Sequence, residues 1–321
     1  MALTEEGLIS VPGIASRWVR LASGAKAHYM TAGDTGPAVI LLHGGLPGSS
    51  GIAGWRFMMP YLAEQGFRVF APDRPGFGLA DTREEYWPHY GMFSWSDFVH
   101  DFATAIGLDR FHLSGNSQGA GVTAQYLVEH PERVISYILI ASFSIHAPLG
   151  LDKDGKARER HPGLAIPKWD GKNETMREMM ESIIYRKDAI SDDLITMRTN
   201  MAVAHDGGFK AAVAFTNNVF SNPSYAQRAN LVGKLDKVTI PGIYLFGADD
   251  VLIPPSAAYE QEKVLTNIQF YYPTETGHQG QTDRPELFNK VYAEFFKTGK
   301  LSPELEKEAS VSSQKAKPAT W

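Results

Sequence analysis

The stretch FHLSGNSQGAGVTAQYLVE, residues 111–129, contains the one Gly-x-Ser-x-Gly match of the chain, Gly115 to Gly119. An apolar run precedes this motif, and a helical pattern follows it. A serine between glycines at a strand-to-helix turn is held in a strained, exposed backbone conformation. Bulkier neighbours would clash with the strand and the helix on either side. The stretch therefore predicts a strand, a sharp turn at Ser117 and a helix.

A turn of this kind also brings backbone donors to the serine. The N–H of Gln118 and the start of the following helix face the serine oxygen, where they would stabilise an oxyanion. Glycine and serine are common in turns, so the pentapeptide alone does not make Ser117 a nucleophile. The partners that a catalytic serine needs must come from elsewhere in the chain.

Short apolar runs on both sides of the motif predict the strands of a mostly parallel sheet buried on both faces. They lie at residues 38–42, 67–71, 111–114, 134–141, 243–246 and 268–272, after an opening hairpin over 19–31 that turns at Gly24. Helical stretches lie between most of them, for example at residues 55–65, 94–106 and 120–130. This alternation predicts an α/β fold with right-handed crossovers and functional residues at the carboxyl ends of strands.

Residues 144–235 interrupt this alternation of strands and helices. A charged entry over 153–161 is followed by helical patterns, one of which carries Met176, Met179 and Met180, and another Arg198. We expect a helical cap at 144–235, inserted between core segments 1–143 and 236–299. The methionines either pack between cap and sheet or form an adaptable apolar wall over a substrate pocket, and both roles stay open. The polar end, 300–321, is predicted to be a disordered tail.

The composition fits one soluble domain with an insertion. The 321 residues are 43% hydrophobic and 21% charged, with a net charge of −5, which argues against nucleic-acid or anionic-membrane partners. Zero cysteines exclude disulfides and thiolate chemistry. Residues 1–24 lack the pattern of a signal peptide, and no apolar run is long enough to span a bilayer. We expect a cytoplasmic protein. A second copy of the chain, in a homodimer, is left open as a partner.

A serine nucleophile needs a base, and the base needs an orienting carboxylate. An acid follows the run at 243–246, where Asp249 and Asp250 are adjacent, and His278 follows the run at 268–272. The usual Gly-x-x-Asp spacing, with a proline four residues later, selects Asp250 and leaves Asp249 as a turn residue. We therefore predict a triad of Ser117, Asp250 and His278.

A second oxyanion donor is expected in the loop that follows the run at 38–42. There the N–H of Gly45 would join that of Gln118, next to Gly44, while His43 braces the loop. The turn at residues 73–78 is expected to shape the wall of the site without chemistry. The sequence has no metal-binding spacing and no dinucleotide fingerprint, so no cofactor is predicted.

With these residues in place, the chain resembles the α/β-hydrolase superfamily over residues 20–298, and within it the meta-cleavage product hydrolases. These enzymes cleave carbon–carbon bonds in ring-fission products of aromatic degradation. The likeness rests on four segments: HGGLPG at 43–48, GNSQG at 115–119, DLITMR at 193–198 and GHQGQ at 277–281.

This resemblance implies a small acidic substrate, a 2-hydroxy-6-oxo-dienoate. It places Gly44, Asn116, Arg198 and Gln279 at substrate-binding positions, with Arg198 and Asn116 at the acid end. The family ketonises the dienol with help from the histidine, and a tetrahedral adduct at the distal carbonyl then collapses with carbon–carbon cleavage. Arg198 has a second interpretation, as a surface residue of its helix.

Three positions depart from the family pattern. Gly54 stands about where the family has asparagine, Gln118 replaces a methionine, and Gln279 replaces a tryptophan. A carboxylic-ester or lactone hydrolase with the same triad is therefore the alternative function. A binding protein that has lost the reaction is a third, disfavoured by the complete set of Ser117, Asp250 and His278. Haloalkane dehalogenases and epoxide hydrolases have aspartate where this chain has Ser117.

Overall fold

The fold was analysed in a computed structural model that describes residues 3–142, 166–218 and 221–314. Its centre is one sheet of eight strands in the order β1-β2-β4-β3-β5-β6-β7-β8. The strands are β1 (Ala15–Arg20), β2 (Lys26–Ala32), β3 (Ala38–Leu42), β4 (Arg68–Pro72), β5 (Phe111–Asn116), β6 (Val134–Ile140), β7 (Gly242–Leu245) and β8 (Gln269–Tyr271). The pairs β1–β2 and β2–β4 are antiparallel, and the other neighbours are parallel. The predicted hairpin and α/β sheet are confirmed.

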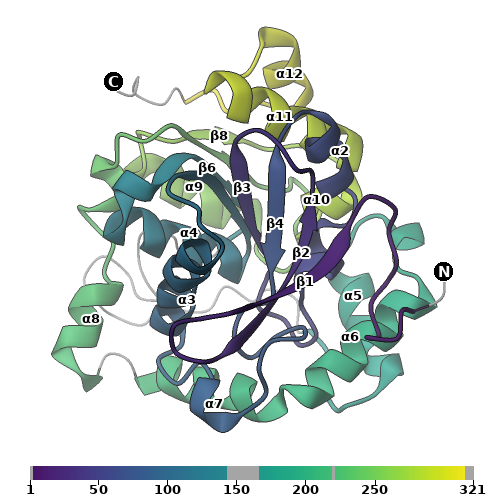
Figure 1. Cartoon of the computed structure of the whole chain (residues 1–321). Coiled ribbons are helices and arrows are strands. Elements are labelled where there is room, and N and C mark those ends of the chain that lie inside the picture. The colour runs from purple at the N-terminus through teal and green to yellow at the C-terminus, as the bar shows by residue number, and fades with distance from the viewer. Residues whose placement is uncertain (1–2, 143–165, 219–220, 315–321) are drawn as a thin grey trace.

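Helices cover both faces of the sheet (Figure 1). One face packs on α1 (Gly51–Trp55), α2 (Met59–Glu64), α10 (Gly280–Asp283) and α11 (Pro285–Thr298), and the other on α3 (Met92–Ala105), α4 (Gln118–Glu129) and α9 (Pro255–Val264). The five residues of β3, all apolar, are buried between these layers. The single helix expected over residues 55–65 is wrong. The chain forms α1 and α2 instead, with Pro60 in the first turn of α2, where its missing N–H is tolerated.

Four described helices lie between β6 and β7, on the side of the sheet where the parallel strands end (Figure 1). They are α5 (Asn173–Ile183), α6 (Asp192–Ala204), α7 (Asp206–Asn218) and α8 (Pro223–Ala229). The charged entry at 153–161 lies outside the described residues. Short 3-10 turns occur at Glu84–Tyr86, Pro131–Arg133, Lys187–Ala189 and Leu235–Lys237.

The methionines of α5 form a cluster distinct from the two clusters on the sheet faces. Met176, Met179 and Met180 pack with isoleucines of α5 and α6, and the half-buried Leu46 and Leu252 pack against them. Leu46 follows Gly45, and Leu252 lies two residues after Asp250. The methionines therefore pack within the helical segment and also over two loops that carry predicted site residues.

The polar C-terminal segment is ordered where the structure describes it. Helix α12 (Pro303–Glu308) buries Leu305, and the chain then pairs with β8 through Tyr272 N to Ser310 O at 2.9 Å and Ser312 N to Phe270 O at 3.0 Å. The expected disorder of residues 300–321 is thus wrong for 300–314, and 315–321 lie outside the described part. An edge strand leaves backbone groups unpaired, and this segment supplies their partners.

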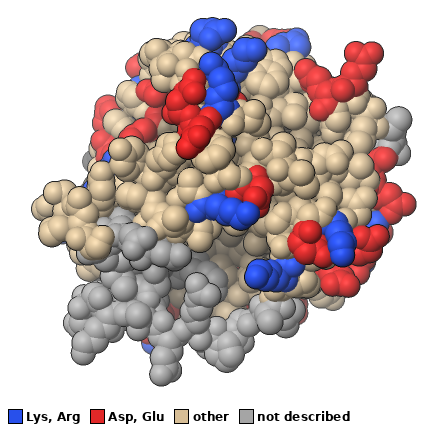
Figure 2. Space-filling view, turned by 90° about the horizontal axis from the view of Figure 1, so that it is seen from below, with Lys and Arg blue, Asp and Glu red and all other residues tan. Residues whose placement is uncertain are grey.

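No helix in the described ranges is long and apolar enough to cross a membrane. The face below the strand ends carries Lys and Arg side chains beside Asp and Glu side chains (Figure 2). On the described part of this face, charges of both signs are therefore mixed.

The turn between β5 and α4 depends on close backbone contacts. A Cβ atom at Gly119 would lie 2.4 Å from the carbonyl oxygen of Leu42, and one at Gly115 would lie 2.2 Å from the carbonyl carbon of Gly119. Ser117, between them, has a φ of 56°, in the left-handed region that L-residues rarely adopt. These contacts explain why the turn needs its glycines.

Substitution of Gly119 by alanine tests this constraint. Gly119→Ala forces the new methyl group against the end of β3, and we expect it to lower the free energy of unfolding by about 1–3 kcal/mol or more. Urea denaturation of the two proteins measures the difference.

Gly121→Ala in the same helix is the matched control. Its Cβ would meet only the flexible end of Met92 at 3.1 Å and Ser142 Oγ at 3.9 Å. Alanine is favoured over glycine inside a helix by about 1 kcal/mol, so this variant should be neutral or more stable. Equal effects of both substitutions would contradict the proposed role of the backbone contact.

Candidate active site

Ser117 lies at the junction of β5 and α4, where its N–H donates to the carbonyl of Ile140 at the end of β6, at 2.7 Å. Its side chain is half-buried. The positive φ turns the serine out of the strand direction, and α4 begins at the next residue, Gln118. The sequence prediction of a strand, a strained turn and a helix is confirmed.

His278 and Asp250 form a buried pair on the loops after β8 and β7. Their side chains are joined by a hydrogen bond of 2.8 Å from His278 Nδ1 to Asp250 Oδ2, and the two residues are only 2% and 3% exposed. The backbone N–H groups of Leu252 and Ile253 donate to Asp250 Oδ1, each at 2.9 Å. A carboxylate only accepts, so Nδ1 carries the proton and Nε2 keeps a free lone pair.

The lone pair on His278 Nε2 is what a base needs. This nitrogen is buried and has no hydrogen-bond partner among the described residues. Hydrogen bonds between a serine and its base are often long before substrate binds. The tautomer that Asp250 imposes therefore leaves the outer nitrogen able to accept a proton.

Asp249 faces a different neighbour. Its Oδ2 accepts a hydrogen bond of 3.3 Å from Thr276 N, and its own N–H donates to Thr276 O at 3.0 Å. These bonds join the β7 loop to the β8 loop. Of the two adjacent aspartates, Asp250 is thus the one paired with the histidine.

The loop that carries His278 is also fixed through its backbone. The Asn116 side-chain amide donates to the carbonyl of His278 at 2.9 Å, and His278 N donates to Ile183 O, at the end of α5, at 3.0 Å. The first bond ties the histidine loop to the residue before Ser117. A contact of Asn116 with substrate stays a prediction, because its N–H group is engaged in this internal bond.

Gln279 directly precedes the short helix α10. Its carbonyl accepts from Thr282 N at 2.7 Å, and its side-chain oxygen accepts from the Thr282 hydroxyl at 3.4 Å. The side chain is therefore turned toward its own helix. A direct role in substrate binding also stays a prediction for this residue.

The glycine loop after β3 lies against the serine turn. A Cβ atom on Gly44 would lie 3.6 Å from Ser117 Cβ, and one on Gly45 would lie 2.5 Å from the side-chain Cδ of Gln118. Gln118 opens α4, and the first N–H groups of a helix have no partner within it. The two N–H groups predicted to bind an oxyanion thus come from adjoining segments.

Arg198 is a buried cation in α6, so its alternative as a surface residue is wrong. The residue is 2% exposed, and its Nη2 donates to Pro47 O at 3.1 Å and to Ser49 Oγ at 3.4 Å. Its Nε has no partner among the described residues. Burial, and then the nearby Arg56, lower the pKa of Arg198 to about 9, which leaves it charged at neutral pH.

Asp283 is a site residue that the sequence patterns missed. Its carboxylate accepts from Gly277 N at 2.7 Å and from Arg186 N at 3.0 Å. It thereby joins the histidine loop to the segment after α5. Burial raises the pKa of Asp283 to about 6. An aspartate five residues after a histidine has no distinctive spacing in a single sequence. Among the described residues, no cluster of His, Asp or Glu is placed to hold a metal ion.

The raised pKa of Asp283 predicts a pH dependence of stability. The folded protein binds this proton more tightly than the unfolded chain, so the contribution of Asp283 is fully present below about pH 4 and is lost as pH rises through 6. Between pH 4 and 7 the free energy of unfolding should fall by up to about 3 kcal/mol more in the native protein than in Asp283→Asn. Urea denaturation across this range measures the two curves.

Asp34→Asn, which changes an exposed carboxylate between β2 and β3, is the control and should follow the native curve. If the native protein and Asp283→Asn gave parallel curves of unfolding free energy against pH, the proposed effect of burial on the pKa of Asp283 would be refuted.

Known proteins resemble this chain over most of its length. The alpha/beta hydrolase fold family matches residues 37–165. A 2-hydroxy-6-oxo-2,4-heptadienoate hydrolase from Pseudomonas putida is 27% identical over 280 residues, which are 86% of this chain and 94% of the relative. A 2-hydroxy-6-oxo-6-phenylhexa-2,4-dienoate hydrolase from Comamonas testosteroni is 25% identical over 284 residues, 84% of this chain and 91% of the relative.

Solved structures of dienoate hydrolases of this kind are also similar to the chain. A mutant of CumD, a meta-cleavage product hydrolase from Pseudomonas fluorescens IP01, has a TM-score of 0.69 and 25% identity, and the match covers 88% of this chain and 97% of that chain. The sheet order, the serine turn and the buried His278–Asp250 pair are consistent with these matches. The chain has the α/β-hydrolase fold, matches the alpha/beta hydrolase fold family over residues 37–165, and is similar over most of its length to the meta-cleavage product hydrolases.

Proposed function

We propose that the protein is a serine hydrolase that cleaves a carbon–carbon bond in a 2-hydroxy-6-oxo-dienoate. The observation that carries the proposal is the buried pair of His278 and Asp250, tied through Asn116 to the turn of Ser117. The names of two relatives, dienoate hydrolases that are 27% and 25% identical to this chain, support this class of substrate.

Ser117, His278 and Asp250 have distinct roles in this proposal. The free lone pair of His278 Nε2 takes the serine proton as Oγ attacks a carbonyl carbon, and Asp250 stabilises the imidazolium that forms. The N–H groups of Gly45 and Gln118 bind the oxygen of the tetrahedral adduct. A low-dielectric position makes these interactions stronger than they would be in water.

Carbon–carbon cleavage needs a preceding proton shift. The enol proton of the substrate moves to the carbon beside the distal ketone, with His278 assisting, so that the leaving fragment becomes a stabilised dienolate. The adduct then collapses, the carbon–carbon bond breaks with its electron pair delocalised into the dienolate, and the imidazolium of His278 gives its proton to the enolate oxygen of the leaving fragment. Water, activated by His278, finally hydrolyses the acyl group from Ser117 and releases a carboxylic acid.

In this proposal Arg198 supplies the positive charge that binds the carboxylate of the substrate. It is buried, it lies against Pro47 and Ser49 of the glycine loop, and its Nε is free among the described residues. A guanidinium with an unused N–H is suited to bind a carboxylate. Gly44, Asn116 and Gln279 stay proposed as further binding residues. The absence of cysteine suits a cytoplasmic location, which we retain as an expectation.

A parallel assay of two substrates tests the proposed function. We expect kcat/KM to be higher for a 2-hydroxy-6-oxo-dienoate, followed by loss of its dienolate absorbance, than for a neutral short-chain aryl ester. Arg198→Met should raise KM for the dienoate about tenfold, the loss of one charged contact, with little change for the ester.

Ser117→Ala is the control and should lose turnover of both substrates. A much higher kcat/KM for the ester would favour the carboxylic-ester or lactone hydrolase instead. Equal kinetics of Arg198→Met and the native protein with the dienoate would remove Arg198 from the acid end. Full activity of Ser117→Ala would defeat both nucleophilic mechanisms.

The two adjacent aspartates give a second test. Asp250→Asn removes the acceptor that fixes the His278 tautomer, so we expect kcat to fall about 10²–10⁴-fold with either substrate. Asp249→Asn, which alters only the contact with Thr276, should stay within about threefold of the native kcat. Steady-state kinetics of both variants measure the contrast, and the reverse ranking would assign the role to Asp249.

A further inference from the structure

Arg74, in the turn after β4, is a buried cation that the proposed mechanism does not use. The residue is 0% exposed, and its Nε and Nη1 have no hydrogen-bond partner among the described residues. The guanidinium lies 5.3 Å from the ring centre of Phe77 and 5.1 Å from that of Trp95. Burial of a charge is costly unless the charge has partners. The hydrogen bonds of the third guanidinium nitrogen, Nη2, are therefore important for stabilising this charge.

The Nη2 atom of Arg74 binds the glycine loop. It donates to the carbonyl of His43 at 2.7 Å and to the carbonyl of Gly44 at 2.8 Å. These carbonyls belong to the peptide units on either side of the Gly44 Cα atom, which lies beside Ser117. The charge of Arg74 therefore acts on the main chain of the loop that holds Gly45.

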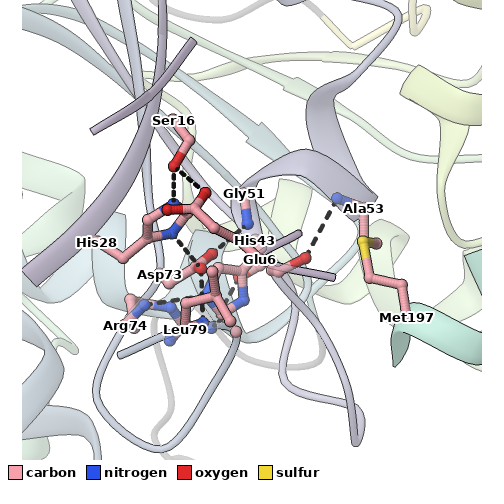
Figure 3. A network of polar contacts seen from close by, with 12 residues as sticks. Glu6, Ser16, His28, His43, Gly51, Ala53, Asp73, Arg74, Leu79 and Met197 are labelled. Atoms are coloured by element: carbon pink, nitrogen blue, oxygen red, sulfur yellow. Dashed lines mark hydrogen bonds and ion pairs between the residues drawn. The ribbon is translucent and has the colours of Figure 1, made fainter. Parts of the chain in front are cut away.

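The neighbouring aspartate does not neutralise Arg74. Asp73 Oδ2 accepts from His28 Nδ1 at 2.7 Å and from Leu79 N at 2.8 Å, and Oδ1 accepts from Gly51 N at 2.7 Å (Figure 3). These three donors occupy the carboxylate. No Arg74 nitrogen pairs with a carboxylate in the described part of the chain, and the arginine charge is left for the two loop carbonyls.

The ring of His43 also binds the carbonyl of Gly44. Its Nε2 accepts a hydrogen bond of 3.1 Å from Arg74 N, so the proton lies on Nδ1, which donates to Gly44 O at 2.7 Å. Burial, and then the charge of Arg74, lower the pKa of His43 to about 3, so the ring is neutral. The carbonyl of Gly44 thus accepts from both His43 and Arg74.

Peptide geometry converts this contact into an effect on the other side of the loop. In a trans peptide the C=O of Gly44 and the N–H of Gly45 point in opposite directions. Fixing the carbonyl on Arg74 and His43 therefore turns the Gly45 N–H away from them. A cation on the carbonyl also polarises the peptide and makes its N–H a stronger donor.

We propose that Arg74 is a positioning residue for the oxyanion site: through the carbonyl of Gly44 it orients and polarises the Gly45 N–H that receives the developing negative charge. The inference rests on the proposed function, in which Gly45 binds the oxyanion formed by attack of Ser117. Its benefit arises in the transition state, where the carbonyl oxygen becomes an anion, and not in the ground state.

A neutral aryl ester is the substrate for the test, because any reaction through Ser117 and this oxyanion site reports on Arg74 whether or not the dienoate is a substrate. Arg74→Met should lower kcat about 10²-fold, the usual loss for one oxyanion donor, with KM within about threefold. The affinity for an arylboronic acid, whose adduct with serine places an oxygen in the oxyanion site, should fall by a similar factor. Arg74→Lys, which keeps the charge, should recover at least tenfold of the lost kcat.

Arg56→Met is the matched control. Arg56 is also a buried arginine whose guanidinium donates to backbone carbonyls, those of Ala53 at 2.7 Å and Ala189 at 2.8 Å, but it does not contact the glycine loop. It should lose stability and keep kcat for the ester within about threefold of the native value. Circular dichroism establishes that each variant is folded at the assay temperature.

Three results would overturn the inference. They are a kcat of folded Arg74→Met within about threefold of native, an equal loss of kcat in Arg56→Met, and unchanged boronic acid affinity despite a lower kcat. If Arg74→Met does not fold, Arg74→Gln, which also removes the charge, takes its place: a kcat lowered at least threefold at unchanged KM supports the role, and a native kcat refutes it. Ester turnover that survives in Ser117→Ala would instead refute the proposed function.

Discussion

The backbone contact at the serine turn is the constraint on which the site depends. Gly119 approaches the end of β3 so closely that no side chain fits, and the strained φ of Ser117 persists only because β5 and α4 are held on either side. The same contact brings the start of α4 against the glycine loop after β3. The proposed nucleophile and both proposed oxyanion donors are thus placed by packing of main chain on main chain, which has few ways to relax.

His278, the proposed base, requires support of a different kind because it lies on a loop. Its carbonyl is bound by Asn116, its N–H by Ile183 O, and its ring by Asp250. Asp283 binds the preceding residue, Gly277, and also Arg186 beyond α5. Two of these bonds reach the inserted helices, so packing of α5 and positioning of the histidine are coupled. A loop held at this many points presents its ring in one orientation before substrate arrives.

The sequence predicted the parts of the site that have a local pattern. Apolar runs locate the strands, and glycine spacing locates the turn of Ser117, because both signals lie within a few residues. The roles of Arg74 and Asp283 could not be predicted. Each depends on backbone groups of a distant segment, and neither residue type nor spacing reveals such a bond. The prediction of a disordered tail was wrong for a related reason. The composition of this segment is polar, but Leu305 and Ala309 are buried, and the segment pairs with the edge strand β8.

Three buried arginines, Arg56, Arg74 and Arg198, donate to main-chain carbonyls and have no ion-pair partner among the described residues. Carbonyl dipoles offset only part of the cost of burying a cation. A carboxylate placed beside Arg74 or Arg198 would stabilise the fold, but it would also cancel the positive potential around the glycine loop. That potential is favourable for an arriving carboxylate and for an oxyanion formed beside Ser117. The uncompensated charges of Arg74 and Arg198 therefore lower the stability of the free protein and, in the proposed reaction, favour the binding and turnover of an anionic substrate.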